Sequence, residues 1–327
     1  MRFLVDTISF RVANYDLNFL LQFLGLFELK IPWESRNGRY NYKSSIYYEG
    51  IQILYGGTEG FECYVTMSGK GCRTYEDLLS ASSDNLWLSL FSDIRNEPDN
   101  FHIARIDIAL DDYTDALEIE KLVKYYRAKK FSSKCSNVRY VLGSEECFYV
   151  GSPQSEILLR IYNKKLERGY SEPEDLDGKP WYRAEMQFRD HKATSVIDEV
   201  LNRGIGETFQ GVLNNHCRFL SKSNDGKNAQ RINNAGFWDY ITGGSRKIKL
   251  ITEPGSLYNK AKLDRYERQF RSSVKTLIYS EGLTADELYS RFVDCKIELN
   301  NDQETYIRRC TDERERTIGT YQEICLL

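Results

Sequence analysis

Long apolar runs are absent from this sequence, and its first residues are charged. A helix that crosses a membrane needs about 20 successive apolar residues, and no stretch of this 327-residue chain reaches that length. The amino end, residues 1–6, already carries an arginine and an aspartate, which a secretory signal does not accommodate. We therefore expect a cytoplasmic protein without a membrane segment.

Histidine is rare and cysteine is scattered. The three histidines, His102, His191 and His216, lie far apart in the sequence, so no zinc hydrolase and no Ser-His-Asp enzyme is indicated. The eight cysteines form no Cys-x-x-Cys pair, which argues against a zinc ribbon and a disulfide framework. The chemistry of this chain has to come from other side chains.

A strong basic excess is also missing. The net charge is −3, whereas proteins that bind nucleic acid indiscriminately carry many more basic than acidic residues. Two segments depart from this average. Residues 121–140 contain seven basic residues and no acidic one, and residues 245–280 contain nine basic and three acidic residues. Each segment is either a solvated helix face or a surface that contacts phosphates and stacks on bases.

Three strand-like stretches carry the functional groups that are present. They span residues 105–111, 160–165 and 183–189. Because successive side chains of a strand point to opposite faces, each stretch has one polar face. The polar residues are Arg105, Asp107 and Asp111, then Arg160, Tyr162 and Lys164, then Arg183, Glu185, Gln187 and Arg189. If the strands are neighbours, one patch holds a tyrosine hydroxyl, several carboxylates and guanidinium groups.

These groups suit the cleavage of a DNA phosphodiester. A tyrosine hydroxyl can form a covalent ester that conserves the bond energy, but its free pKa is about 10, so it needs help at neutral pH. A divalent cation held by carboxylates can polarise the phosphate, and arginine or lysine can share that role. We predict Asp107 and Glu185 as metal ligands, with Asp111 next. Mg²⁺ or Mn²⁺ is the expected cofactor, because hard cations prefer oxygen ligands.

Four pieces of the sequence resemble the replication initiation factor (Rep_trans) family in their order and spacing. They are residues 68–73 (SGKGCR), 104–111 (ARIDIALD), 159–168 (LRIYNKKLER) and 181–187 (WYRAEMQ). The third piece is the specific one, and the residues after about 245 match more loosely. The family comprises initiators of rolling-circle plasmid replication and relaxases of conjugative elements.

The resemblance implies a catalytic role for Tyr162, which would attack DNA and leave a 5′-phosphotyrosyl link and a free 3′-hydroxyl. It implies phosphate contacts for Arg160, Lys164 and Arg183, and the strand alternation favours Lys164 over Lys165. The expected partners are DNA at an origin of replication or transfer, supercoiled or single-stranded, and a PcrA-type helicase. A homodimer is left open.

Several alternatives remain at this stage. HUH nickases hold their metal with two histidines that flank one hydrophobic residue, so the scattered histidines exclude that class. A non-cleaving protein that recognises an origin or operator is the alternative to an enzyme, in which Tyr162 would only pack. Plasmid initiation and conjugative transfer are not separated. Sequence recognition is expected from residues 121–140 or from the carboxy-terminal basic helices.

The pattern of elements predicts an α+β fold, with a large, curved, mainly antiparallel sheet, helices on one face and a C-terminal helical appendage. We expect a catalytic nicking and strand-transfer domain over residues 1–250 and a helical region over 251–327 that binds DNA or a partner. Residues 68–71 lack the spacing of a phosphate-binding loop and predict a tight turn that positions Arg73. A weak similarity between residues 5–10 and 105–109 hints at two similar halves.

Overall fold

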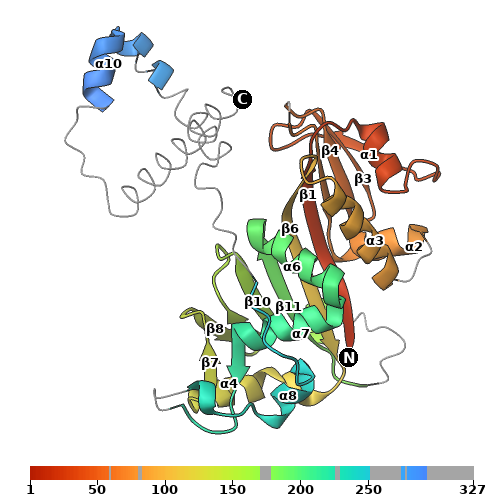
Figure 1. The fold of residues 1–327 in the computed structure, drawn as a ribbon, viewed down its shortest axis with the longest axis vertical. Coiled ribbons are helices and arrows are strands. Elements are labelled where there is room, and N and C mark those ends of the chain that lie inside the picture. The colour runs from red at the N-terminus through yellow and green to blue at the C-terminus, as the bar shows by residue number, and fades with distance from the viewer. Residues whose placement is uncertain are drawn as a thin grey trace, which may run out of the picture. The chain divides into compact units, whose positions relative to one another are not determined.

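The computed structural model describes residues 1–58, 60–79, 83–169, 178–224, 229–250, 274–276 and 278–292 (Figure 1). The chain divides into two units, Met1–Thr252 and Glu253–Leu327. The role expected for the second unit, DNA or partner binding, stays a prediction. No helix among the described residues is both long and apolar enough to cross a membrane.

Ten strands of the first unit form one sheet in the order β2-β3-β4-β5-β1-β6-β11-β10-β9-β8, and every neighbouring pair is antiparallel. The strands are β1 (Arg2–Val12), β2 (Glu34–Asn37), β3 (Ser44–Tyr48), β4 (Ile51–Tyr55), β5 (Cys63–Met67), β6 (Phe101–Asp112), β8 (Val138–Val141), β9 (Cys147–Val150), β10 (Ile157–Asn163) and β11 (Tyr182–Arg189). A separate pair joins β7 (Phe131–Ser133) to β12 (Cys217–Phe219). The predicted α+β class with a large antiparallel sheet is confirmed.

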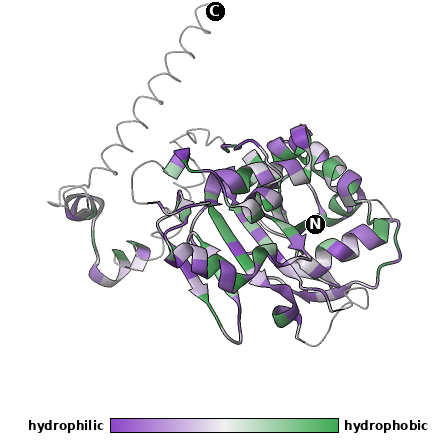
Figure 2. Cartoon of the chain, turned by 90° about the horizontal axis from the view of Figure 1, so that it is seen from below, coloured by the Kyte–Doolittle hydropathy of each residue, from purple (hydrophilic) through white to green (hydrophobic). Residues whose placement is uncertain are grey.

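Helices cover one face of this sheet (Figure 1). The described α-helices of the first unit are α1 (Leu17–Phe23), α2 (Gly69–Leu79), α3 (Ser83–Asn96), α4 (Ile119–Arg127), α5 (Lys164–Arg168), α6 (Asp190–Arg203), α7 (Ile205–His216) and α8 (Gly236–Thr242), and α10 (Ala285–Phe292) belongs to the second unit. Apolar residues of α2, α3, α6 and α7 share one core with alternate residues of the strands, such as Ile106 and Ile108 of β6. Hydrophilic and hydrophobic residues alternate along the strands (Figure 2), so the polar residues between them face the side without these helices.

The sheet consists of two halves with the same strand order. In the first half β1 pairs with β5, and β4, β3 and β2 follow towards one edge; in the second half β6 pairs with β11, and β10, β9 and β8 follow towards the other. In chain order, a helix follows the first and the last strand of each half: α1 follows β1 and α2 follows β5, whereas α4 follows β6 and α6 follows β11. The similar residues 5–10 and 105–109 therefore lie on β1 and β6, the corresponding strands that pair at the centre of the sheet.

A bulge distorts this central pair. Thr7 pairs with Asp107 and Val5 pairs with Ile108, so Asp6 is an extra residue in β1 with no partner on β6. Bulges re-aim a side chain, and here the carboxylate of Asp6 contacts Arg183 of β11. The two halves thus meet at an acidic residue on the polar face.

The SGKGCR segment differs from its prediction. We expected a tight turn, but α2 begins at Gly69, and Cys72 N–H already donates to the carbonyl of Ser68 at 2.7 Å. A side chain at position 71 would place its Cβ 2.1 Å from the carbonyl oxygen of Gly50. Glycine is therefore needed because the β3–β4 turn packs directly on the first turn of the helix.

In the second unit, the structure describes residues 274–276 and 278–292. The spacing Thr284-x-x-Glu287 in the sequence predicts a capping box, which is present at the start of α10: Thr284 N–H donates to Glu287 Oε2 at 2.8 Å, and Glu287 N–H donates to Thr284 Oγ1 at 3.4 Å. Apolar residues at helical spacing from 263 to 277 predict a basic helix that ends near Gly282, and a polar helix is predicted from Asp302 to about Thr317. The second of these helices and most of the first lie outside the described residues.

Candidate active site

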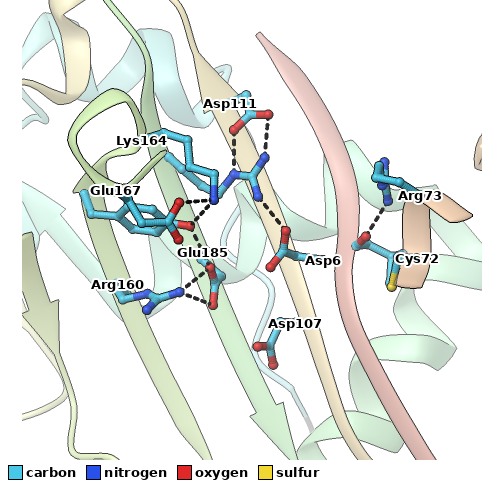
Figure 3. Close-up of polar contacts among 12 residues, drawn as sticks. Asp6, Cys72, Arg73, Asp107, Asp111, Arg160, Lys164, Glu167 and Glu185 are labelled. Carbon is cyan, nitrogen blue, oxygen red and sulfur yellow. Dashed lines mark hydrogen bonds and ion pairs between the residues drawn. The ribbon is translucent and has the colours of Figure 1, made fainter. Parts of the chain in front are cut away.

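The three polar strand stretches lie side by side, because β11 pairs with β6 on one side and with β10 on the other (Figure 3). The register places Arg183 opposite both Tyr162 and Asp111, and Glu185 opposite both Arg160 and Ala109. Side chains two residues apart on one strand share a face, so all these polar groups point to the same side. The strand adjacency expected from the sequence is therefore observed.

Tyr162 is the only tyrosine among these polar groups. The apolar core lies on the helical side of the sheet, and the side chain of Tyr162 is not part of it. Tyr162 is nevertheless only 3% exposed, because charged neighbours cover it. The hydroxyl donates to Glu185 Oε2 at 3.2 Å, and Lys164 Nζ lies 3.4 Å from the same oxygen. The Arg160 guanidinium carbon stands 4.6 Å from the ring centroid. Burial, followed by the charge of Glu185, raises the pKa of Tyr162 above its ordinary value near 10.

Glu185 is held by an ion pair as well as by this tyrosine. Arg160 Nη2 donates to both carboxylate oxygens, at 3.1 and 2.8 Å. The Glu185 side chain is 6% exposed and Arg160 is 39% exposed, so the carboxylate is buried beneath a guanidinium that reaches solvent. A phosphate arriving from solvent would meet Arg160 first.

Asp107 is the most deeply buried acid of the polar face. Arg105, two residues earlier on β6, pairs with it through Nε at 2.8 Å and through a second, shorter contact of Nη2. Burial is the main cause that raises the pKa of Asp107 to about 6, and the charges of Glu185 and Asp6 add to it against the effect of Arg105. These three carboxylates are thus close enough to repel one another.

Asp111 and Asp6 both hold Arg183. Arg183 Nε and Nη2 donate to the two Asp111 oxygens at 2.6 and 2.8 Å, and Nη1 donates to Asp6 Oδ1 at 2.5 Å. Asp111 lies four residues from Asp107 on the same strand, which corresponds to roughly 13 Å. Asp111 therefore does not share a cation with Asp107 in this arrangement, and its partner is an arginine.

Asp6 is the site residue that the sequence reasoning missed. Burial, ahead of the neighbouring charges, raises its pKa, and the interacting groups include Arg183, Glu185 and Lys164. The signal that could have found it is the similarity of residues 5–10 to residues 105–109, which aligns Asp6 with Asp107. That similarity covers a single strand length, so the pairing of β1 with β6 was needed to interpret it.

Lys164 approaches the tyrosine from a helix and not from a strand. β10 ends at Asn163, whose side-chain oxygen caps α5 by accepting from Lys165 N–H at 3.1 Å. Lys164 Nζ contacts Glu167 Oε2 at 2.5 Å as well as the Tyr162 hydroxyl. Lys164 does lie on the polar face, as expected, but it does so as the first residue of α5 and not through strand alternation.

The acidic residues suit a hard divalent cation in their chemistry. Among the described residues, no three histidine, cysteine or acidic side chains converge as a ready-made metal centre. Mg²⁺, however, is usually bound by one or two carboxylates, with water and substrate phosphate completing its shell. Asp107 and Glu185 lie diagonally across neighbouring strands and repel each other. A cation between them would relieve that repulsion, so Asp107 and Glu185 suit a divalent cation.

Two family models and a solved structure that match this chain all describe replication initiation proteins. Residues 101–291 match a family model described as "Replication initiation factor", and residues 2–93 match one described as "Rolling Circle replication initiation protein N-terminal domain". Among solved structures, a rolling circle replication initiator protein from Geobacillus stearothermophilus aligns with a TM-score of 0.63 and 25% sequence identity over 76% of this chain and 99% of that chain. No curated protein matches the chain.

Proposed function

The chain belongs to the replication initiation factor family, and from this premise we propose that it nicks one DNA strand at an origin by attack of Tyr162. Both family models and the similar structure support a role in rolling-circle replication initiation. Rolling-circle initiators are nicking endonucleases in general, and they generally depend on a metal ion. The tyrosine, its helpers and the identity of the metal are the parts that we add.

One observation carries the proposal: the Tyr162 hydroxyl donates to Glu185 Oε2 on a polar face lined with guanidinium groups. A nucleophile within hydrogen-bond reach of a base is the arrangement that covalent catalysis requires. In the proposed step, Tyr162 Oη attacks phosphorus and its proton passes to Glu185. The bond to the 3′ oxygen breaks, that oxygen takes a proton from water, and the 5′-phosphate stays on the tyrosine.

The basic side chains hold the phosphate in this scheme. Arg160 and Lys164 border Tyr162. The guanidinium of Arg160 reaches solvent, and Lys164 Nζ lies beside the tyrosine hydroxyl. Arg183 lies opposite Tyr162 in the register, and Asp111 and Asp6 fix its orientation. Donors that are oriented in advance stabilise the charge of a pentacoordinate phosphate without having to reorganise.

A divalent cation fits the same place. Asp107 and Glu185 would hold Mg²⁺ or Mn²⁺, with Asp6 as the next carboxylate in place of the expected Asp111. When bound, such a cation supplies charge neutralisation at the scissile phosphate. Arg105 and Arg160 are the counter-charges of these acids in the described arrangement.

The partners of this reaction are proposals as well. DNA at an origin of replication or transfer is the substrate, a PcrA-type helicase would open the duplex from the nick, and the protein would act in the cytoplasm. Plasmid replication and conjugative transfer need the same cleavage chemistry, so the residues of the site do not separate them.

The test is a nicking assay on supercoiled plasmid that carries the cognate origin. With Mn²⁺ or Mg²⁺, we expect open circles with covalently attached protein. The low exposure of Tyr162 favours the alternative, a non-cleaving origin- or operator-binding protein. Specific binding to the origin without open circles or adduct, under conditions of saturating protein and metal, would establish that alternative.

A further inference from the structure

Lysines from the first basic segment and from the start of the second, residues 245–250, lie near one another on one surface of the first unit. Lys134 comes from the first segment and follows β7, whereas Lys247 and Lys249 come from the second and lie more than a hundred residues later. Their positive charges act on one another across this sequence gap. We call Lys134, Lys247 and Lys249 the lysine surface.

The backbone holds these lysines together through α7, which is labelled in Figure 1. Lys134 Nζ donates to Asn215 Oδ1 at 2.6 Å, at the end of that helix. Asn214 Nδ2 donates to the Ser245 carbonyl at 2.9 Å, and Ile248 N–H donates to the Gly211 carbonyl at 3.0 Å. The segment that carries Lys247 and Lys249 is therefore attached along the same helix that anchors Lys134.

The packing of this segment turns its lysines outward. Ile248 and Leu250 are buried in the core, and the residues that alternate with them, Lys247 and Lys249, are exposed. A Cβ at position 211 would lie 2.6 Å from Ile248, so glycine at this position allows the close contact. Lys134 is exposed as well. Buried contacts thus position Lys247 and Lys249, and the backbone N–H of Lys134 donates to the His216 carbonyl at 3.1 Å, so the arrangement does not depend on the lysine head groups.

The charge of the lysine surface is not balanced within the described part of the chain. No ion pair joins Lys134, Lys247 or Lys249 to an acidic side chain of the described residues. Desolvation and the charges of Lys249 and Lys192 lower the pKa of Lys134, and desolvation with the charges of Arg218 and Lys134 lowers that of Lys247. The charges that lower these two pKa values are positive, so a negatively charged partner would stabilise the surface.

We infer that the lysine surface binds the phosphate backbone of duplex DNA next to the nick site. Lysine presents a point charge that contacts phosphates without reading bases. Single-stranded DNA favours exposed aromatic side chains for stacking, whereas Phe131 of β7, three residues before Lys134, packs against Phe219 at 4.9 Å. A duplex, whose phosphates lie on its outside, matches lysines without free rings.

The surface lies away from the proposed nucleophile. His216, next to Asn215, contacts the carbonyl of Val150 at the end of β9, whereas Cys147, at the other end of β9, pairs with Tyr162. Arg189 ends β11 and pairs in register with Arg105 of β6, and Lys192 follows on α6. These basic residues connect the polar face with the lysine surface, so flanking duplex can be held while Tyr162 acts on the strand.

The test compares two triple variants that lose the same charge. In K134Q/K247Q/K249Q, each lysine on the surface is neutralised; in K30Q/K43Q/K179Q, three other exposed lysines are neutralised. Binding to a short duplex without an origin is measured from about 50 to 200 mM salt. For the first variant we expect the negative slope of log K against log salt to become shallower by about 3, roughly one per lost phosphate contact; for the control we expect it to stay unchanged.

This inference rests on the proposed function only in taking DNA as the partner, and cleavage of a single-stranded origin oligonucleotide separates the two. If the wild type does not cleave it, the proposed function fails, while the difference in salt slope still decides the lysine surface. Equal slopes for both variants, with unchanged melting temperatures, would overturn the inference. Competition by polyglutamate as strong as by duplex DNA would also overturn it, because an acidic protein would then be the partner.

Discussion

Tyr162 and Glu185 lie diagonally across β10 and β11, with the phenolic oxygen 3.2 Å from Oε2 of the carboxylate. Arg160 pairs with the same carboxylate at 2.8 Å and also stands over the ring of Tyr162. The tyrosine is therefore held between a carboxylate and a guanidinium on the polar face. The predictions below follow from this relationship and from the other acids of the polar face.

Replacing Tyr162 by phenylalanine should abolish nicking and leave DNA binding unchanged. The substitution removes one oxygen and its hydrogen bond to Glu185, at a cost of about 1 kcal/mol in the free energy of unfolding. Nicking is measured with supercoiled plasmid and binding with a labelled origin duplex. The matched control is Y149F, because Tyr149 lies opposite Arg160 on the next strand and should keep full activity. Covalent adduct in Y162F would assign the attack to another tyrosine.

Glu185→Gln should slow strand cleavage by about 100-fold or more, the usual contribution of a positioned base. The glutamine keeps the shape of the side chain but no longer takes the proton of Tyr162, and Arg160 loses its ion pair. The rate is measured in a single turnover with an oligonucleotide. Glu167→Gln is the control, since Glu167 contacts Lys164 and not the hydroxyl. A wild-type rate in E185Q would remove Glu185 from the mechanism.

Asp107 should give the protein a characteristic pH dependence of stability. Its pKa of about 6 in the folded state lies above the ordinary value of 3.8. Between these values the folded state keeps a proton that the unfolded state has lost, so the free energy of unfolding falls as the pH rises from about 4 to 6. Urea denaturation of the wild type and of Asp107→Asn across this range isolates the effect, because the asparagine does not titrate.

In that comparison, the stability of D107N relative to the wild type should rise with pH up to about 6 and then stay level. A difference that does not change with pH would mean that the carboxylate of Asp107 is not desolvated in the folded protein.

Asp111→Ala should destabilise the fold by about 3–5 kcal/mol, because it leaves the buried charge of Arg183 without its main partner. The free energy of unfolding is measured by chemical denaturation. Asp6→Ala is the informative comparison: Arg183 then keeps both oxygens of Asp111, so the loss should be smaller. Equal losses would show that the guanidinium is shared evenly between the two acids.

Metal binding should depend on Asp107 and not on Asp115, an aspartate at the start of the short helix after β6. Titration of Mn²⁺ followed by electron paramagnetic resonance should show a bound ion in the wild type and in D115A, and much weaker binding in D107A, because a ligand carboxylate is not readily replaced. If D107A binds Mn²⁺ as tightly as the wild type, the cation site lies elsewhere.

Strand alternation was sufficient to predict which residues share the polar face. Asp107 and Glu185 each lie between buried apolar residues and Tyr162 follows the buried Ile161, so a period of two assigns all three to one side without a structure. Turn residues at 151–155 between two strand-like stretches likewise predict the hairpin of β9 and β10, and the spacing Thr284-x-x-Glu287 predicts the capping box. Local patterns therefore predicted the elements and the facing of their side chains.

Non-local contacts account for what the sequence did not reveal. The role of Asp6 depends on a bulge in β1 and on Arg183, which lies far away in the sequence. The distance of Asp111 from Asp107 depends on strand rise, and its ion pair with Arg183 depends on the register. The helix at Gly69 depends on contact with Gly50 across the β3–β4 turn. Each of these features arises from packing between segments, which a local pattern does not encode.

Mapping the DNA-linked peptide tests the central claim most directly. After cleavage of an origin oligonucleotide in the presence of Mn²⁺, the covalent adduct is digested with trypsin and nuclease and sequenced by mass spectrometry. The account predicts a 5′-phosphonucleotide on Tyr162, in the tetrapeptide from Ile161 to Lys164 that trypsin releases. A nucleotide on any other residue, or cleaved DNA with no linked peptide, would contradict it.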